Sequence, residues 1–489
     1  MKIYVTILCL GLLLTGPQTF PQADKASAYF NAINFYASYD HLLTDAELTS
    51  IPNDPKWASL LEKVKQNSST LPQRKLETIY TELNKAKLIL DKDAGKLWGY
   101  PIWDDHIFVL DYDNTVYAIK PFPGCSTDDG KLFYAHVPAN TFVFVNTIQS
   151  YQGKDYAVVL SNYLSDHSIT VIHELFHLLQ LKNMKLNGNA IKYLDHYDAR
   201  ELLRLEYQAL RNTLSSINNK SPKIKTRSYF EDALLFRKIR QEKYKEFLPN
   251  ELEIETLEGL ANYTGFVLST SENKYESAIE EIDRRENAET YTRPFPYATG
   301  VAYGLIFDHL KLQWKQGLKK VYNFLDIYDR KKSIDTGKQA IAKARLRNNF
   351  EQIHEQEEAR RIKNENLKAY YFELLQVKPT LKVVIGENYG RTFNMNGTIE
   401  LPDLGTVYSS IKGRDKSGKN FGNFETIGDK AYLGNAGILM LNDYKTLVFP
   451  TPFKIDGNKI IGATYQIDLN KGWGVEKIDD KGNYVIKQN

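Results

Sequence analysis

Two histidines and a glutamate share one short apolar segment of this sequence. In TVIHELFHLLQ, residues 170–180, His173 and His177 stand four positions apart, and Glu174 follows the first histidine. Residues four apart lie on one face of an α-helix, so both imidazoles can be directed at one point. Zinc binds imidazole nitrogen at about 2.0–2.1 Å and keeps one position for water in catalytic sites. Because Glu174 can reach that water and accept its proton, the segment predicts a metal-binding helix with Glu174 as general base.

A site with two histidines needs a third protein ligand. The extension H-x-x-G-x-x-H is excluded, because Gln180 and Asn183 occupy its glycine and final histidine positions. The other common solution is a glutamate on a later helix, and the segment ETLEGLANY offers Glu258. The small residues Gly259 and Ala261 would let this helix approach the histidine helix closely. Glu258 is therefore a candidate for the third ligand. The alternatives for this position are Glu206, then His196 or Asp195.

The segment around Glu258 also carries a family resemblance. Its E-G-L-A-x-Y pattern resembles the gluzincin clan of zinc peptidases, whose aminopeptidase branch has its third ligand in a similar N-E-G-x-A-x-Y helix. The resemblance covers about residues 156–310 and extends to uncharacterised exported bacterial zinc peptidases with similar E-G-L-A-x-Y-T-G and Y-A-T-G blocks. It implies one Zn²⁺ per chain, held by His173, His177 and Glu258. The segment before Glu258 is longer than in the aminopeptidase branch, so helices over about 198–246 are predicted to form an insertion.

Hydrolysis also requires a donor for the negative charge that develops on the carbonyl oxygen. In RPFPYATGVAYG, Tyr297 precedes Gly300 by three positions, and gluzincins often place a tyrosine on such a Y-x-x-G segment. The resemblance therefore implies Tyr297 as this donor, with Arg293 beside it. Tyr263 and Tyr303 are alternatives, and a packed aromatic is the competing interpretation in a chain with 32 tyrosines.

Two further expectations concern the surroundings of the histidines. Asn262 and Gln180 are candidates to hydrogen-bond a ligand histidine from behind. The strand YAVVLS, residues 156–161, leads into the histidine helix, and we predict it as a sheet edge. Gluzincins resemble this in their substrate-binding edge, where an added peptide strand supplies main-chain hydrogen bonds.

The elements that must position these residues follow from hydrophobic periodicity. Residues 24–100 are predicted to be helical, 106–161 to form short strands that begin with a hairpin turning at Asp113-Asn114, and about 165–375 to be helical again, with Ser165 or Asp166 capping the histidine helix. Within the last segment, residues 198–246 are predicted to form an antiparallel helix pair and residues 343–375 one charged helix. Past Pro379, short apolar runs alternate with Gly, Asn and Asp turns. We therefore predict an α+β protein: a mostly helical zincin-like unit with a small sheet over 24–375, then an all-β sandwich or small barrel over 376–489.

The charge composition of the chain limits the kinds of binding partner that can be expected. Basic and acidic residues number 63 and 60, so the net charge is only +3, and no basic stripe with interleaved aromatics points to nucleic acid. The N-terminal run MKIYVTILCLGLLLTGPQ indicates a signal peptide over residues 1–23. We expect an exported, periplasmic or extracellular product without a membrane span after signal removal. Only Cys125 would then remain, which excludes an intramolecular disulfide.

Two functional hypotheses follow. The first is an exported zinc metallopeptidase that acts on peptide or protein substrates. Because a G-x-M-E-N stretch is absent, an aminopeptidase activity is less favoured, and endo- and exopeptidase activity both stay open. In this hypothesis the insertion walls off the cleft and restricts substrates to small peptides. The alternative is a non-catalytic secreted or envelope protein that retains the zincin fold and binds a partner or glycan through its β domain.

Overall fold

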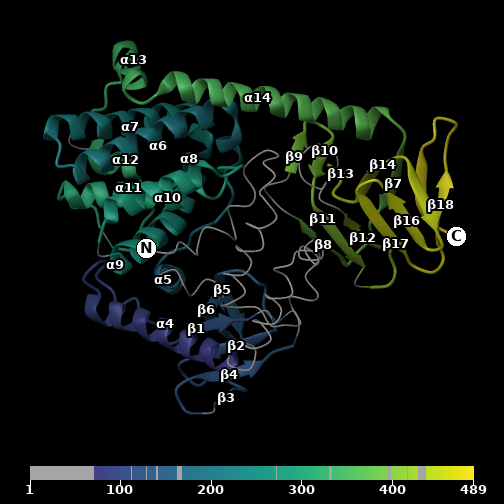
Figure 1. Ribbon diagram of the computed structural model, residues 1–489, viewed down its shortest axis with the longest axis horizontal. Helices are drawn as coiled ribbons and strands as arrows, with labels where there is room; N and C mark the ends of the chain where they lie inside the picture. The colour runs from purple at the N-terminus through teal and green to yellow at the C-terminus, as the bar shows by residue number, and fades with distance from the viewer. Residues whose placement is uncertain are drawn as a thin grey trace, which may run out of the picture. The chain divides into compact units, whose positions relative to one another are not determined.

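The chain is an α+β protein with an all-β C-terminal part, which confirms the predicted fold class (Figure 1). The computed structural model describes residues 71–489, apart from positions 112, 128, 139–140, 162–167, 271, 316, 330–332, 394–397, 416 and 428–436. The predicted signal peptide, the helices expected before residue 71 and the predicted caps Ser165 and Asp166 lie outside these residues. Two compact units are formed, Met1–Ile353 and His354–Asn489.

The first unit contains one mixed six-stranded sheet with the strand order β3-β4-β2-β1-β6-β5. Its strands are β1 (Ile107–Leu110), β2 (Thr115–Ala118), β3 (Ser126–Thr127), β4 (Phe133–His136), β5 (Thr147–Tyr151) and β6 (Lys154–Leu160). β1 and β2 form the predicted antiparallel hairpin, and Asn114 adopts the left-handed φ of 63° in its turn. β6 lies parallel to β1 and antiparallel to β5.

Both faces of the central strands are buried, because successive side chains point to opposite faces of a sheet. Val109 and Val159 belong to the main core, together with residues of α4 (Leu71–Asp93) and α5 (Ile169–Asn183). On the other face, Phe108 stacks on Tyr156 with ring centroids 3.9 Å apart, inside a smaller aromatic core. This doubly buried sheet is the platform on which α5 lies.

Helices enclose the rest of the main core. They are η3 (Lys192–Asp195), α6 (Tyr197–Asn218), α7 (Lys223–Lys243), η4 (Lys245–Phe247), α8 (Leu248–Ile254), η5 (Glu255–Gly259), α9 (Leu260–Ser269), α10 (Lys274–Glu286), α11 (Phe295–His309), α12 (Phe324–Asp329) and α13 (Lys338–Arg347). α6 and α7 form the antiparallel pair predicted from the sequence: Ser216 contacts Thr226 near the turn, and Asp198 contacts Tyr244 at the far end. η5 is a single π-helical turn between α8 and α9.

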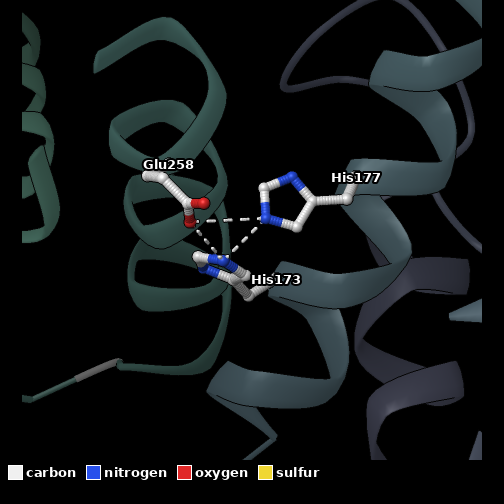
Figure 2. A group of neighbouring side chains, drawn as sticks. All are labelled: His173, His177 and Glu258. Atoms are coloured by element: carbon white, nitrogen blue, oxygen red, sulfur yellow. Dashed lines mark hydrogen bonds and ion pairs between the residues drawn. The ribbon is translucent and has the colours of Figure 1, made fainter. Parts of the chain in front are cut away.

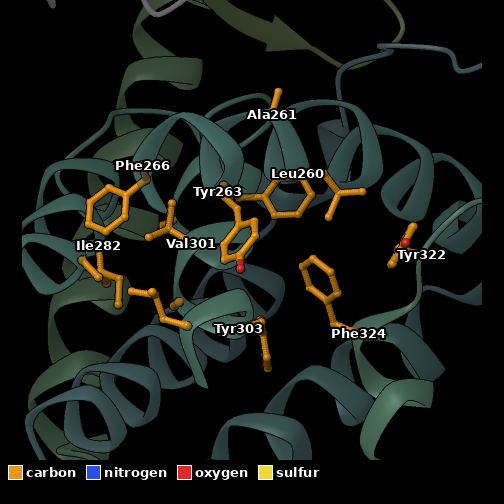
Figure 3. Packing of buried hydrophobic residues seen from close by; sticks show 14 of the residues in the cluster. Leu260, Ala261, Tyr263, Phe266, Ile282, Val301, Tyr303, Tyr322 and Phe324 are labelled. Carbon is orange, nitrogen blue, oxygen red and sulfur yellow. The ribbon is translucent and has the colours of Figure 1, made fainter. Parts of the chain in front are cut away.

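Aromatic side chains fill the centre of the main core, where α9, α11 and the segment before α12 meet (Figure 3). The Trp98 ring packs against Phe176 of α5 and Tyr263 of α9, with centroids 5.5 Å and 6.2 Å away. Its indole N–H donates to Thr264 Oγ1 at 2.9 Å, which satisfies a polar group that would be costly to bury unpaired. One aromatic side chain thus joins α5, which carries His173, to α9, which directly follows the π-turn of Glu258.

Two sequence-based expectations about these elements are wrong. The strand at 156–161 is not an edge: β6 lies between β1 and β5, and β5 is the outermost strand on that side of the sheet. The charged segment from residue 343 is not one helix. α13 ends before Asn348, whose side chain donates to Asp232 and to the carbonyl oxygen of Ala344, and Asn349 has a left-handed φ of 54°. This break separates α13 from α14 (Phe350–Phe372).

The second unit is a sandwich of two sheets that share one core. The first sheet has seven strands in the order β18-β19-β7-β14-β13-β10-β9, and the second has six in the order β15-β16-β17-β12-β11-β8. Their bounds are β7 (Thr380–Val384), β8 (Tyr389–Phe393), β9 (Thr398–Leu401), β10 (Gly405–Tyr408), β11 (Ile411–Asp415), β12 (Gly422–Thr426), β13 (Ile438–Leu441), β14 (Thr446–Pro450), β15 (Phe453–Asp456), β16 (Lys459–Gly462), β17 (Tyr465–Leu469), β18 (Trp473–Lys477) and β19 (Tyr484–Gln488). Phe449 of one sheet and Phe424 of the other meet at 5.4 Å in this core.

The end of α14 belongs to the second unit. Tyr371 and Leu375, the latter in the π-turn η6 (Glu373–Val377), pack on Val407 and Leu439 of the first sheet. Across all the helices that the structure describes, none combines the length and apolarity needed to cross a bilayer.

Candidate metal centre

The helix α5 carries three of the predicted site residues on its buried side. Leu175 and Phe176 are fully buried and anchor the helix in the main core. His173 and Glu174 are also buried, at 6% and 4% exposure, so they point away from bulk solvent. The helix starts after Ser168, whose backbone is left-handed (φ 71°) and whose side chain makes no capping hydrogen bond. The histidine face is therefore positioned by packing.

Glu258 of η5 meets both histidines (Figure 2). Its Oε2 lies 3.3 Å from His173 Nε2 and 3.5 Å from His177 Nε2, and the two Nε2 atoms are 2.9 Å apart. Among the His, Cys, Asp and Glu side chains that the structure describes, these three form the group able to hold a metal ion, with ligand atoms within 4.8 Å of one another. The structure thus brings together the three residues predicted as ligands.

The three ligand atoms have the spacing that a small tetrahedral ion requires. Ligands about 2.0–2.1 Å from a tetrahedral centre lie about 3.3 Å apart. The two carboxylate–imidazole distances are close to this value, and the imidazole pair is slightly tighter. Two imidazole nitrogens and one carboxylate oxygen are also a ligand set that divalent transition metals accept. The residues present therefore fit a single metal ion.

Glu174 lies beside this cluster with an incomplete set of partners. Its Oε2 atom is buried and has no hydrogen-bond partner among the described residues. An unpaired buried carboxylate oxygen is costly, and such atoms mark places where a water, an ion or a substrate completes the structure. Burial also raises the pKa of Glu174 to about 8, since the charged form is poorly solvated there. This carboxylate is suited to gaining and losing a proton.

The metal-free histidines have opposite protonation preferences. Burial and the neighbouring His177 lower the pKa of His173 to about 4. Burial also disfavours the charged form of His177, but the hydrogen bond and charge of Glu258 outweigh it and raise its pKa to about 9. Burial by itself would raise the pKa of the Glu258 carboxylate. The hydrogen bonds and charges of His173 and His177 outweigh this effect, so the pKa is lowered and the carboxylate stays charged. A metal ion must displace the proton of His177, so its affinity should fall with acidification.

The imidazole of His177 is oriented by Gln180, one of the two residues predicted for such a role. His177 Nδ1 lies 2.8 Å from Gln180 Oε1. The amide nitrogen of Gln180 donates to the carbonyl oxygens of Thr256 and Leu257 at 2.8 Å and 3.1 Å. One side chain therefore sets the ring orientation of His177 and ties α5 to η5. The other candidate, Asn262, donates to the Tyr297 carbonyl oxygen at 2.8 Å instead.

Glycines allow the site helices to touch, although their partners differ from the prediction. A Cβ on Gly300 of α11 would lie 2.2 Å from the carbonyl oxygen of Gly259, so η5 and α11 are in backbone contact. Gly259 thus faces α11, whereas Gly265 of α9 makes the close approach to α5, at Ile169. The predicted role of Gly259 in the approach to the histidine helix is wrong, and its contact positions Glu258 against Tyr297.

Tyr297 of α11 reaches the cluster as predicted, but Arg293 does not. The Tyr297 hydroxyl donates to Glu258 Oε2 at 2.7 Å, and its ring stacks on His173 with centroids 5.6 Å apart. Burial and the Glu258 carboxylate raise the pKa of Tyr297, so the hydroxyl keeps the proton that it donates. Arg293 is exposed before α11. The arginine at Tyr297 is Arg285 of α10, whose guanidinium lies 4.4 Å from the ring centre.

The residues considered as alternative ligands or oxyanion donors lie away from the histidine cluster. Glu206 accepts hydrogen bonds from Arg237, Arg240 and Tyr303, all inside the core. Asp195 accepts from the Arg200 side chain and the Tyr291 amide, and His196 is exposed at the start of α6. The Tyr263 hydroxyl donates to Asp308. These contacts are structural, so Glu258 and Tyr297 are the residues that the geometry selects.

No protein-family model, curated protein or solved structure matches this chain. The structure thus defines an α+β protein with a candidate three-ligand metal centre.

Proposed function

We propose that this protein is a zinc-dependent peptidase that hydrolyses peptide bonds with a metal-activated water. The observation that carries the proposal is the convergence of His173, His177 and Glu258 beside a buried carboxylate with a free oxygen, Glu174 Oε2. Zinc is the favoured ion, because it takes imidazole and carboxylate ligands in tetrahedral sites and leaves a fourth position open in catalytic ones. The H-E-x-x-H order in α5 matches this assignment.

The three ligands would hold one zinc ion per chain. When bound, zinc lowers the pKa of a water molecule and polarises a carbonyl group. Glu174 accepts the proton of the attacking water and later donates it to the leaving amine, a role suited to a buried carboxylate whose Oε2 has no partner among the described residues. Tyr297 donates its hydroxyl hydrogen to the oxyanion, since it lies at the ligand cluster and keeps its proton. Gln180 holds His177 in the tautomer that leaves Nε2 free for the metal.

The outermost strand β5 is the element that would bind an extended substrate. Its outer edge has no neighbouring strand in the described sheet, and a peptide can pair there through main-chain hydrogen bonds. Strand addition reads the backbone, so we expect peptide or protein substrates of varied sequence. Export through the N-terminal signal would place this activity in the periplasm or outside the cell.

The proposal is tested with Glu174→Gln, compared with Glu280→Gln on the exposed face of α10. We expect purified Glu174→Gln to keep one zinc ion per chain by elemental analysis but to cleave a broad peptide library about 10²–10⁴-fold more slowly, because the proton acceptor is lost. Glu280→Gln should match the wild-type protein in both assays. Equal cleavage by Glu174→Gln and wild type would show the assigned base to be wrong.

His173→Ala tests whether the three predicted ligands bind the metal. This variant should lose its zinc on dialysis, because two remaining ligands bind weakly. If the wild-type protein retains zinc and cleaves no peptide, the non-catalytic binding protein is the better explanation. If the wild-type protein retains no zinc at all, the metal site itself is refuted.

A further inference from the structure

We propose that Arg237, Glu255 and Thr299, here called the brace, are positioning residues that place Glu258 within reach of the two histidines. The proposal rests on the metal-binding part of the proposed function and does not depend on hydrolysis. The helix pair α6–α7 is predicted from the sequence as an insertion that walls off a cleft. The proposal assigns it a different role, because its inner face holds the π-turn that carries Glu258.

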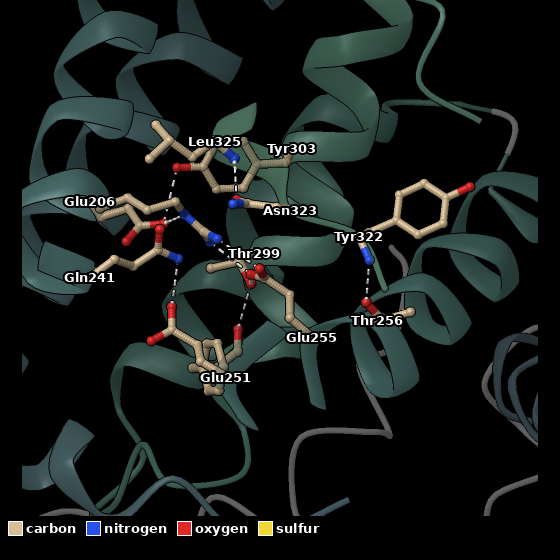
Figure 4. A network of polar contacts seen from close by, with 12 residues as sticks. Glu206, Gln241, Glu251, Glu255, Thr256, Thr299, Tyr303, Tyr322, Asn323 and Leu325 are labelled. Carbon is tan, nitrogen blue, oxygen red and sulfur yellow. Dashed lines mark hydrogen bonds and ion pairs between the residues drawn. The ribbon is translucent and has the colours of Figure 1, made fainter. Parts of the chain in front are cut away.

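The brace is part of a buried ion cluster (Figure 4). The guanidinium of Arg237 donates to both oxygens of Glu255 at 2.7 Å, and its Nε donates to Glu206 Oε1 at 2.8 Å. Arg237, Glu206 and Glu255 are at most 1% exposed. A bidentate arginine–carboxylate pair fixes the orientation of both groups, and at this depth it is shielded from solvent. The Glu255 side chain is therefore held in one geometry relative to α7.

Glu255 and Glu258 belong to the same π-turn, η5, so fixing one residue restricts the other. π-turns are rare and occur often at functional sites, because they change which way neighbouring side chains point. Here the turn directs Glu255 to Arg237 and Glu258 to His173 and His177. If the pair between Arg237 and Glu255 were lost, η5 would keep its hydrogen bonds to Gln180 but lose its anchor on α7.

Thr299 connects the brace to the tyrosine segment. Its hydroxyl donates to Glu255 Oε1 at 2.5 Å, and it lies on α11 two positions after Tyr297. The backbone contact between Gly259 and Gly300 adjoins this bond. The same three residues thus connect α7, η5 and α11, which carry the anchor, the third ligand and the proposed oxyanion donor.

A role in stability alone would be a weak explanation for this cluster. Buried ion pairs lose much of their attraction to the cost of desolvation, and apolar replacements are often as stable. What such pairs do supply is a defined geometry, because a displaced partner leaves a buried charge unpaired. A metal ligand needs that definition, since mutating the groups that orient metal ligands typically costs about 10–100-fold in metal affinity.

The gentlest test compares two buried threonines. Thr299→Val removes the hydroxyl that binds Glu255, whereas Thr213→Val removes one that binds only the carbonyl oxygen of Ala209 in its own helix. We expect Thr299→Val to weaken Zn²⁺ binding about tenfold in a competition assay with a chromophoric chelator. It should also change the visible spectrum of the Co²⁺-substituted protein. Thr213→Val should leave both unchanged.

A stronger test compares two buried arginines on one helix. Arg237→Lys cannot form the bidentate pair with Glu255, whereas Arg240→Lys alters contacts to Glu251 and Glu206 but none to η5. Both variants should melt at lower temperature. Arg237→Lys should weaken zinc binding more than about tenfold, and Arg240→Lys should not.

The outcomes separate the brace from the metal site. If Thr299→Val and Arg237→Lys bind zinc as tightly as the wild-type protein, the brace is wrong and the proposed function stands. Equal losses in Arg237→Lys and Arg240→Lys, together with an unaffected Thr299→Val, would also overturn it, because they would reflect general destabilisation. Failure of the wild-type protein to bind zinc would remove the metal site, and the brace with it.

Discussion

Two buried clusters of charged groups lie next to each other in the first unit, and they differ in how completely their members are paired. In the ion cluster, Glu206, Glu251 and Glu255 each accept hydrogen bonds from a buried arginine. In the metal centre, two imidazole nitrogens face each other at 2.9 Å, and Glu174 Oε2 has no partner among the described residues. Both clusters draw on the same π-turn, but the ion cluster lies deeper. The side chains of Arg237, Glu206 and Glu255 are at most 1% exposed, whereas those of His177 and Glu258 are 11% and 19% exposed.

The comparison separates groups that hold the fold from groups that await a ligand. Burying a charge costs free energy unless another group compensates it, so a cluster left incomplete by the protein alone indicates a partner from solution. In the ion cluster the chain itself supplies an arginine to each of the three carboxylates, although Arg240 Nε has no hydrogen-bond partner among the described residues. The candidate metal centre brings three possible ligands together near the unpaired oxygen of Glu174, and a divalent cation would complete the cluster.

The largest expected effect comes from opening the completed cluster. Arg237→Met should lower the free energy of unfolding by about 3–5 kcal/mol, because it leaves Glu255 without its charged partner. In metal-free buffer, His173→Ala should cost less than about 2 kcal/mol, since no compensating cation is lost. Urea unfolding of both variants with a chelator present measures the difference. A loss in His173→Ala as large as that in Arg237→Met would erase the distinction between the clusters.

Metal removal should act on the incomplete cluster alone. A ligand that binds only the folded state stabilises it by about 2.7 kcal/mol when its free concentration is about 100 times its Kd. Chelation should therefore lower the melting temperature of the wild-type protein and leave that of His173→Ala unchanged. Calorimetry with and without zinc measures this shift. Equal shifts in the two proteins would mean that zinc stabilises the fold from another site.

A smaller effect is expected where the two clusters meet. Gly300→Ala would place a methyl group 2.2 Å from the Gly259 carbonyl oxygen, which forces η5 and α11 apart. Overpacking of this kind costs about 1–3 kcal/mol, and here it should also weaken zinc binding, because Glu258 moves with η5. Gly304→Ala, on the same helix, meets the Tyr263 ring instead and serves as the control. Titration with zinc measures the metal affinity of both variants. Equal losses of zinc affinity in Gly300→Ala and Gly304→Ala would contradict this expectation.

The smallest effect is expected at a surface ion pair near the end of α5. Burial tends to raise the pKa of Asp104, but hydrogen bonds from Lys182 and His106 outweigh it and lower the value to about 2. A depressed carboxyl pKa adds stability above the unfolded value of about 3.9, and this stability is lost as the pH falls toward 2. Asp104→Asn should cost under about 1 kcal/mol at neutral pH, because Lys182 is exposed. Urea unfolding at pH 7 and pH 2 should show a smaller difference from wild type in acid, because Asp104 is then largely protonated in the unfolded state and about half protonated in the folded state.

The parts of this molecule that follow from short-range rules could be predicted from the sequence. His173 and His177 point the same way because helical geometry fixes residues four apart, and the β1–β2 hairpin follows from a period of two around Asn114. The choice of Glu258 over Glu206 depends on which helix faces α5. That arrangement is long-range, and only the resemblance to a known zinc-peptidase pattern indicated it.

What could not be predicted depends on tertiary contacts without a local signal. Arg285 sits in the charged run EEIDRRE, where nothing marks one arginine as the partner of Tyr297. Arg293 is nearer in sequence but exposed, because α11 begins after it and turns Tyr297 inward. The break at Asn348 and Asn349 depends on the buried hydrogen bond to Asp232, which comes from a distant helix. The edge position of β5 is likewise a property of the whole sheet.

The π-turn η5 also determines the directions in which the side chains of this helical segment point. Its five residues complete one turn with more chain than an α-helix uses. Deleting one residue between Glu255 and Glu258 would leave only the chain that an α-helical turn needs, and it would change the directions of the side chains within η5. Glu258 would then swing away from the histidines while composition and hydrophobicity stayed almost unchanged. A substitution at Leu257, within this turn, should therefore be tolerated far better than a change in the length of the turn.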